Sequence, residues 1–182
     1  MKKLVLVAFL LCGISPINAQ FVFAPEGLTD FVVTEVPGKT KAEMYKSTLD
    51  WIQVTFKKAD AVKAKTENET ITFEGTGKFV SMDGAMKLTY DSRYEVQIIF
   101  KDGKYKFDIL KLEYFTERNQ VNPGGWRAIE LSDVSAYFTK QGTLRPVYKH
   151  FTEIADHFNA VNSELKKFIE SGASVPTKKS EW

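Results

Sequence analysis

The chain is almost free of cysteine. Its single cysteine, Cys12, lies in an N-terminal segment with the features of a secretory signal, which are a charged start and an apolar run from Leu4 to Gly13. Ala19 is a small residue at the position expected for cleavage, so we expect the signal to end there. The mature chain then contains no cysteine. A disulfide framework is excluded, and the hydrophobic core alone must stabilise the fold.

The chain also lacks an excess of either charge. Loss of Lys2 and Lys3 with the signal leaves 23 basic residues beside 23 acidic ones. A neutral exported chain argues against nucleic-acid binding, which needs a basic surface to neutralise phosphates. No apolar run after the signal is long enough to span a bilayer. We therefore expect one exported domain in the periplasm, in the cell envelope or secreted. A lipid anchor is not expected, because a lipoprotein signal has a small residue just before its cysteine, whereas Leu11 precedes Cys12.

Signatures of common catalytic sites are missing. The mature chain has no nucleophilic cysteine and no Gly-x-Ser-x-Gly elbow. The segment "EGTGKF" resembles a phosphate-binding loop only in composition, because it falls inside a predicted strand rather than before a helix. The carboxylates of Asp91, Glu95 and Asp108 share the polar face of the predicted sheet with Arg93. Hydrated carboxylates of this kind usually solvate a surface.

Histidine is scarce, and its two copies lie seven residues apart. His150 and His157 share a face of the predicted C-terminal helix, with Glu153 between them at helical spacing. Two imidazoles and a carboxylate could ligate a metal ion. The interpretation we favour is a solvated helix edge, because Glu164 continues the same row.

Three helical segments are predicted. Thr40 and Glu43 form a capping box that starts a helix ending near Lys57. A second, long helix is expected from Leu144 to Ser171, and its apolar residues alternate four and three apart. The apolar stripe of the first helix comprises Tyr45, Leu49, Ile52 and Phe56, flanked by Met44 and Trp51. A short helix is also expected from Leu131 to Thr139.

Strands are expected at Phe31–Val36, Val62–Thr66, Thr70–Val80, Met86–Phe100 and Lys104–Phe115. The Asp83-Gly84 and Asp102-Gly103 pairs predict two-residue hairpin turns. The second turn sets Phe100 opposite Tyr105, Ile98 opposite Phe107 and Val96 opposite Ile109. The first sets Phe79 opposite Leu88, Phe73 opposite Tyr94 and Ile71 opposite Val96. Both hairpins bury the same face of their shared strand, which supports the register.

Gly75 and Gly77 interrupt this apolar face. The expected register places Gly77 opposite Tyr90 and Gly75 opposite Ser92. The interpretation we favour is a bend in the sheet with Tyr90 covering the bare backbone. The alternative is room for a ligand between sheet and helix.

Two further features lie beyond the regular strands. The alternation fails at Leu110, so Leu112 and Tyr114 are expected on the face that had been polar, where a partner or another segment must cover them. Trp126 is expected on a loop after Gly124-Gly125. It either anchors a partner or folds back over Leu112 and Tyr114.

Three segments follow one another between about Phe31 and Phe115, roughly half of the chain. They are "VVTEVPGKTKAEMYKSTLDWI", "ITFEGTGKF" and "DGKYKFDI". In this order they resemble a family of exported Bacteroidota proteins, a domain of unknown function with a fold like the TATA-binding protein. The resemblance implies a TBP-like fold and no catalytic residues.

We therefore expect an α+β fold in the order β-α-β-β-β-β. A curved antiparallel sheet packs on the N-terminal helix, and the long C-terminal helix follows. The alternative is a helix-grip arrangement in which that helix lies in the concave sheet and encloses a cavity. The expected parts are a signal (1–19), an extension (20–30), the TBP-like domain (31–115), a loop with C-terminal helices on the same domain (116–171) and a flexible tail (172–182).

Three functions remain open. The first is a non-enzymatic binding or interaction module whose partner is an envelope protein. The second is a carrier of a small apolar ligand, with a pocket near Trp51, Gly75, Gly77 and Tyr90. The third is a metal-dependent enzyme that uses His150, Glu153 and His157. No cofactor is expected. The oligomeric state is left open, since the apolar seam of the last helix could pair with a second copy.

Overall fold

The computed structural model describes residues 20–57, 60–83, 86–132 and 134–174. The expected signal (1–19), Gly84 of the first predicted turn and the end of the expected tail (175–182) lie outside these residues. The elements are β1 (Phe23–Ala24), β2 (Gly27–Leu28), β3 (Phe31–Glu35), α1 (Lys41–Phe56), β4 (Val62–Thr66), β5 (Thr70–Asp83), β6 (Met86–Lys101), β7 (Lys104–Thr116), β8 (Gly125–Ala128), the 3-10 helices η1 (Ser135–Tyr137) and η2 (Pro146–Phe151), and α2 (Thr152–Ser171).

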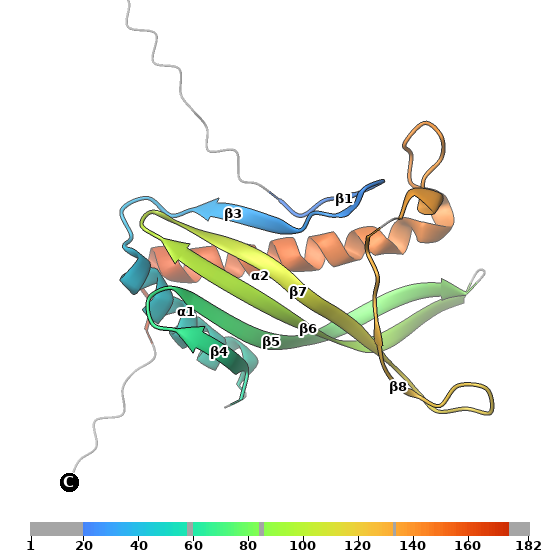
Figure 1. Cartoon of the computed structure of the whole chain (residues 1–182), viewed down its shortest axis with the longest axis horizontal. Helices are drawn as coiled ribbons and strands as arrows, with labels where there is room; N and C mark the ends of the chain where they lie inside the picture. Colours follow the sequence, from blue (N-terminus) through green and yellow to red (C-terminus); the bar gives the residue numbers. More distant parts are fainter. Residues whose placement is uncertain (1–19, 58–59, 84–85, 133, 175–182) are drawn as a thin grey trace, which may run out of the picture.

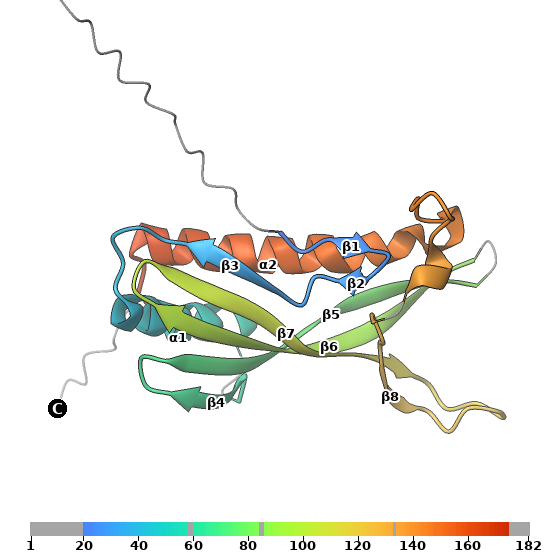
Figure 2. The same cartoon turned by 45° about the horizontal axis from the view of Figure 1, so that its top comes forward.

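One antiparallel sheet forms the body of the protein. Its strands follow the order β3-β7-β6-β5-β4, and β8 pairs with the far end of β7. Figures 1 and 2 show a strongly twisted sheet with α1 and α2 on the same side of it. The two helices contact each other. This arrangement confirms the predicted α+β fold with a long C-terminal helix. That helix packs beside α1 and along the inner face of the sheet.

The first helix begins where its capping box predicts. The backbone N–H of Thr40 donates to Glu43 Oε2 at 2.8 Å, and the Glu43 N–H donates to Thr40 Oγ1 at 3.3 Å. This exchange lowers the pKa of Glu43, because the ionised carboxylate accepts the hydrogen bonds. The fully buried positions of α1 are Met44, Tyr45, Thr48, Trp51 and Ile52, and Leu49 and Phe56 pack at the margin of the core.

The two hairpins differ in how well the sequence predicted their register. The β6–β7 hairpin pairs Phe100 with Tyr105 and Ile98 with Phe107, as predicted. Gly103 in its turn has φ +77°. In the β5–β6 hairpin Phe79 pairs with Tyr90 instead of Leu88, and Asp83 pairs with Met86. The predicted register is wrong by two residues, because Asp83 belongs to the ladder and not to the turn. A shift of two keeps every side chain on its predicted face.

The expectation that Leu112 and Tyr114 change face is wrong. Glu95 pairs with Lys111 but Val96 pairs with Ile109, so Leu110 is an extra residue in β7. Such a β-bulge restores the phase of the alternation. Beyond it Leu112 and Tyr114 pack at the edge of the same core as the earlier apolar residues. Leu110 itself is 49% exposed.

The C-terminal half has less α-helix than predicted. The segment from Leu144 starts as the 3-10 helix η2, and the α-helix begins only at Thr152. The short helix expected from Leu131 to Thr139 is reduced to η1, because Val134 and Phe138 turn inward. Both pack with Phe23 in a small second cluster. Tertiary burial thus overrides a weak helical pattern.

A buried polar network joins α2 to the sheet. The Tyr105 hydroxyl donates to Asn162 Oδ1 at 2.8 Å, and Asn162 Nδ2 donates to Thr34 Oγ1 at 2.9 Å. All three side chains are at least 92% buried. Burial raises the pKa of Tyr105, so its hydroxyl stays a neutral donor. Buried polar groups need partners, so this network fixes where α2 lies along the inner face.

Asn162→Ala is expected to lower the free energy of unfolding by about 1–3 kcal/mol, because the Tyr105 and Thr34 hydroxyls lose their buried partner. Urea unfolding followed by circular dichroism measures the change. Ser163→Ala, at the next and exposed position of α2, is the matched control and should change stability little. Equal effects of the two substitutions would contradict the role of the network.

Candidate functional site

The space beside the two strand glycines is filled. Gly75 lies opposite Tyr94, and a Cβ atom at Gly75 would collide with the Tyr94 ring. Gly77 lies opposite Ser92, and a Cβ there would be 3.5 Å from Cε1 of His157 on α2. The expected pairing with Tyr90 and Ser92 is therefore displaced by two residues. The side chain that covers Gly75 is Tyr94, not Tyr90.

Trp51 and Tyr90 do not meet beside these glycines. Trp51 packs edge-on against Phe73, with ring centroids 5.7 Å apart. Tyr90 packs against Tyr114 at 5.2 Å, in the far half of the sheet. The residues expected to form one apolar pocket therefore belong to separate parts of the core.

The two histidines and Glu153 do converge. His150, Glu153 and His157 line one small cavity between α2 and the strands, of about 30 Å³. That volume suits a single water molecule. Within the described part of the chain, no three or more His, Cys, Asp or Glu side chains are arranged to hold a metal ion. The cavity is also far smaller than the ligand space that a helix-grip arrangement would enclose.

Both histidines have lowered pKa values. Desolvation of the ring is the main cause for each, because loss of water disfavours the charged imidazolium; it acts on the ring of His157 although that residue as a whole is exposed. Glu153 opposes the shift at His150, and Glu164 opposes it at His157. The ring nitrogens of His150 are buried without a hydrogen-bond partner of good geometry. His150 instead contacts Phe151, with ring centroids 4.5 Å apart.

Trp126 lies on the outer face of the sheet. It is part of β8 rather than a loop, and it packs against Phe115 with ring centroids 5.4 Å apart. The Arg93 guanidinium lies 4.3 Å from the centre of a Trp126 ring and donates to Glu113 at 2.6 Å. Trp126 therefore does not cover Leu112 and Tyr114, which face the core. It remains 38% exposed.

An opening lies in the sheet edge, between β3 and β8. Both strands pair with β7, but at its two ends. Between them, residues 109–112 of β7 border a gap closed by two other segments. One corner is the pair Phe31 and Asp108. At the second, the Ile129 N–H donates to the Leu112 carbonyl at 2.9 Å, and at the third the Leu28 N–H donates to the Leu131 carbonyl at 3.2 Å.

Gly27 allows the third corner to close. Its φ of +125° suits glycine, and a Cβ atom there would collide with the carbonyl oxygen of Leu131. Ser132 forms an isolated bridge with Gly27. The β1–β2 hairpin is thereby held against the segment that follows β8.

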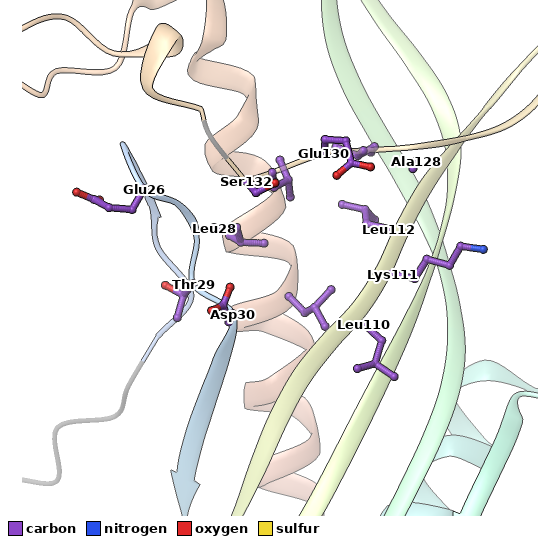
Figure 3. Close-up of a pocket in the computed structure, with 13 residues that line it drawn as sticks. Glu26, Leu28, Thr29, Asp30, Leu110, Lys111, Leu112, Ala128, Glu130 and Ser132 are labelled. Atoms are coloured by element: carbon purple, nitrogen blue, oxygen red, sulfur yellow. The ribbon is translucent and has the colours of Figure 1, made fainter.

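The enclosed space has a volume of about 270 Å³. Figure 3 shows Leu28 and Leu112 directed toward it from opposite walls, while Lys111 points away. Lys111 is instead paired with Glu113 at 3.0 Å. The apolar lining residues are Leu28, Ile109, Leu110, Leu112, Ala128, Ile129 and Leu131, and the polar ones are Glu26, Thr29, Asp30, Lys111, Glu130 and Ser132.

Comparison with known families and structures identifies the central part of this fold. Residues 31–115 match a family described as a domain of unknown function (DUF4468) with TBP-like fold. For this match we call residues 31–115 the DUF4468 domain. The match covers the same residues as the resemblance found in the sequence, and no curated protein matches the chain.

Two solved structures resemble the DUF4468 domain and its flanks. A TBP-like protein from Parabacteroides distasonis is 13% identical with a TM-score of 0.50, over 77% of this chain and 90% of that one. A DUF4468 family protein from Bacteroides ovatus is 13% identical with a TM-score of 0.44, over 85% of this chain and 90% of that one. The first likeness supports the TBP-like fold. At this identity it says nothing about ligands.

Sequence reasoning missed the opening because only one wall belongs to the DUF4468 domain. The other walls come from residues 26–30 and 128–132, which no local pattern joins. One signal was available, since the alternation fails at Leu110, and bulges often lie next to functional sites.

We expect stability to fall as the pH decreases through about 6.5, the ordinary pKa of histidine. The folded-state pKa values of His150 and His157 lie below that value, so the unfolded state binds protons first. Urea unfolding between about pH 5 and 7.5 measures the dependence. The double variant His150→Phe, His157→Phe should lose most of it, and an unchanged slope would contradict the assignment.

Proposed function

We propose that the protein is an exported, non-enzymatic binding module of the cell envelope, and that it binds its ligand in the opening beside Leu110. The observation that carries this proposal is the cavity of about 270 Å³ with an apolar floor and a polar rim. Sites that bind small molecules usually have volumes of about 300 Å³ or more. The opening therefore suits a small amphipathic molecule or one side chain of a partner protein.

The charges around the opening favour a cationic or neutral polar end on that ligand. Glu26, Asp30 and Glu130 lie on the exposed rim, and no salt bridge joins them to another described residue. Lys111, the cation of the lining, is held by Glu113 outside the opening. An anionic ligand would meet net negative charge at the rim.

A binding role is favoured over catalysis by the state of the ionisable groups. The outer-face carboxylates that the sequence singled out are engaged in ion pairs or hydrated, as in Lys78 with Asp91 and Lys106 with Asp108. Paired or hydrated carboxylates on an open sheet face usually solvate the surface. The described helices include none that is both long enough and apolar enough to cross a bilayer.

Cleavage after Ala19 is compatible with the way the fold uses the first described residues. Phe21 is 2% exposed and lies in the main core. Its N–H donates to Asn159 Oδ1 at 2.8 Å, and Asn159 Nδ2 donates back to its carbonyl at 2.9 Å. Cleavage after Ala19 keeps this anchor, whereas a cut a few residues later would remove it.

The exported protein is expected to begin at Gln20. Ala19→Arg should block cleavage, because the residue before the cut must be small. Asn18→Arg is the matched control, since the residue just before Ala19 need not be small. N-terminal sequencing of protein from the periplasmic and membrane fractions gives the answer. An uncleaved chain confined to the cytoplasm would overturn the proposed location.

Binding in the opening is tested with three probes that share a six-carbon body: 1-hexylamine, 1-hexanol and hexanoate. Titration into ¹⁵N-labelled protein should shift the amide resonances of residues 28–30, 109–112 and 128–132, with hexylamine most effective and hexanoate least. Ala128→Phe should fill the opening and abolish the shifts. Ala64→Phe, an equally exposed change on β4, should leave them. Absence of shifts at these residues with all three probes would refute the site.

A further inference from the structure

The two outer edges of the sheet differ in how they are protected. In the described part of the chain the sheet ends at β4 on one side and at β3 on the other. β4 carries the exposed residues Lys63 and Lys65, and its register shifts between Val62 and Ala64. Lysines and bulges are the usual means by which natural proteins prevent an edge strand from pairing with another chain.

β3 has neither form of protection. It pairs with β7 over five consecutive residues without a register shift. Its inward side chains, Val32 and Thr34, are buried, whereas Phe31 is 46% and Val33 is 37% exposed. Glu35 at its end is its single charged residue. Figures 1 and 2 show this strand at the border of the sheet, with no strand beyond it.

The backbone of β3 is oriented for pairing at this free edge. The Val36 N–H, directly after the strand, donates to the Gly103 carbonyl at 2.8 Å. Residues in an antiparallel strand alternate in the side to which their N–H and C=O groups point. Val32 and Thr34 therefore bond toward β7. The N–H and C=O groups of Phe31, Val33 and Glu35 point to the free edge.

We propose that β3 is a self-association edge, at which it pairs antiparallel with β3 of a second copy of the chain around a two-fold axis at Val33. This inference goes beyond the proposed ligand binding and does not depend on it. Identical strands close only in this isologous arrangement. Val33 lies opposite Val33 of the copy, and Phe31 lies opposite Glu35 of the copy. Every outward-facing backbone group of the strand then gains a partner.

The charges next to the edge are compatible with this register. The Lys106 ammonium lies 4.2 Å from the centre of the Phe31 ring. Lys106 is already paired with Asp108 at 2.6 Å, and Glu35 with Lys104 at 4.0 Å, so these charges are compensated within one chain. The axis at Val33 sets each Glu35 opposite the uncharged Phe31 and keeps the two Glu35 carboxylates at opposite ends of the paired strands. Axes at Val32 or Thr34 also keep the side chains on their faces, but they shorten the overlap and no longer place the two exposed Val33 side chains together. A second copy therefore fits the edge without opposing like charges.

The paired edge is short, so the dimer should be weak and dissociate on dilution. Sedimentation velocity of the full chain over roughly 10 μM to 1 mM should show a sedimentation coefficient that rises with concentration. Val33→Lys sets two like charges opposite each other and should weaken association about tenfold or more. Val54→Lys, at a similarly exposed position on α1, is the matched control and should behave as wild type.

A disulfide test checks the register separately. In the background Cys12→Ser, Val33→Cys introduces the single cysteine of the chain. Opposed residues of a hydrogen-bonded pair have Cα atoms about 5.5 Å apart, within the range of a disulfide. Val33→Cys should therefore crosslink on mild oxidation. Phe31→Cys and Val54→Cys should not, because Phe31 lies opposite Glu35 of the copy.

Each measurement has an outcome that overturns the proposal. A wild-type chain that stays monomeric up to the highest concentration excludes self-association and leaves the edge to a strand of another protein. A dimer that Val33→Lys leaves intact uses another surface. Crosslinking through Phe31→Cys but not Val33→Cys contradicts the two-fold axis at Val33. Circular dichroism of every variant confirms that the outward substitutions have left the fold unchanged.

Discussion

The fold depends on keeping one apolar face continuous along the thirteen residues of β7. The strand lies next to β6 throughout and forms the floor on which α2 packs. Its sequence alternates correctly as far as Ile109 and then loses phase. The extra residue Leu110 corrects the phase at the cost of one unpaired position. Without the bulge, Leu112 and Tyr114 would face water and Glu113 would face the core.

The same bulge lies beside the gap in the sheet edge. β3 pairs with β7 before it, and β8 pairs with β7 after it. Neither strand continues across the intervening residues, so the β1–β2 hairpin and the segment after β8 close the gap from outside. The opening therefore follows from the way the sheet solves its own packing problem. The DUF4468 domain provides one wall, and the flanking segments provide the others.

The inner face is held by a few interactions between distant segments. Asn162 of α2 joins the hydroxyls of Thr34 and Tyr105, and Asn159 holds both backbone groups of Phe21. Apolar packing alone is not directional, so it would allow a long helix to slide along a smooth sheet. These hydrogen bonds select one position. The outer face, in contrast, carries ion pairs and the Arg93–Trp126 contact. In the described part of the chain, no strand pairs with the outer edge of β3.

The sequence by itself determined the local structure. The capping box at Thr40 placed the start of α1, and the Asp102-Gly103 turn set the β6–β7 register, because both depend on residues close together in the chain. The family resemblance added the TBP-like topology. The β5–β6 register and the short helix near Val134 were mispredicted. Asp83 belongs to the ladder although Asp-Gly is a common turn pair, and burial outweighed a weak helical pattern.

Only the tertiary structure decided the sites. Tyr94 rather than Tyr90 covers Gly75, because a two-residue shift in register exchanges neighbours without exchanging faces. The walls of the opening are brought together by backbone hydrogen bonds between residues about a hundred positions apart, such as Leu28 and Leu131. Backbone groups are the same in every residue, so no side-chain pattern encodes that contact. The free edge at β3 likewise appears only when the order of strands is known.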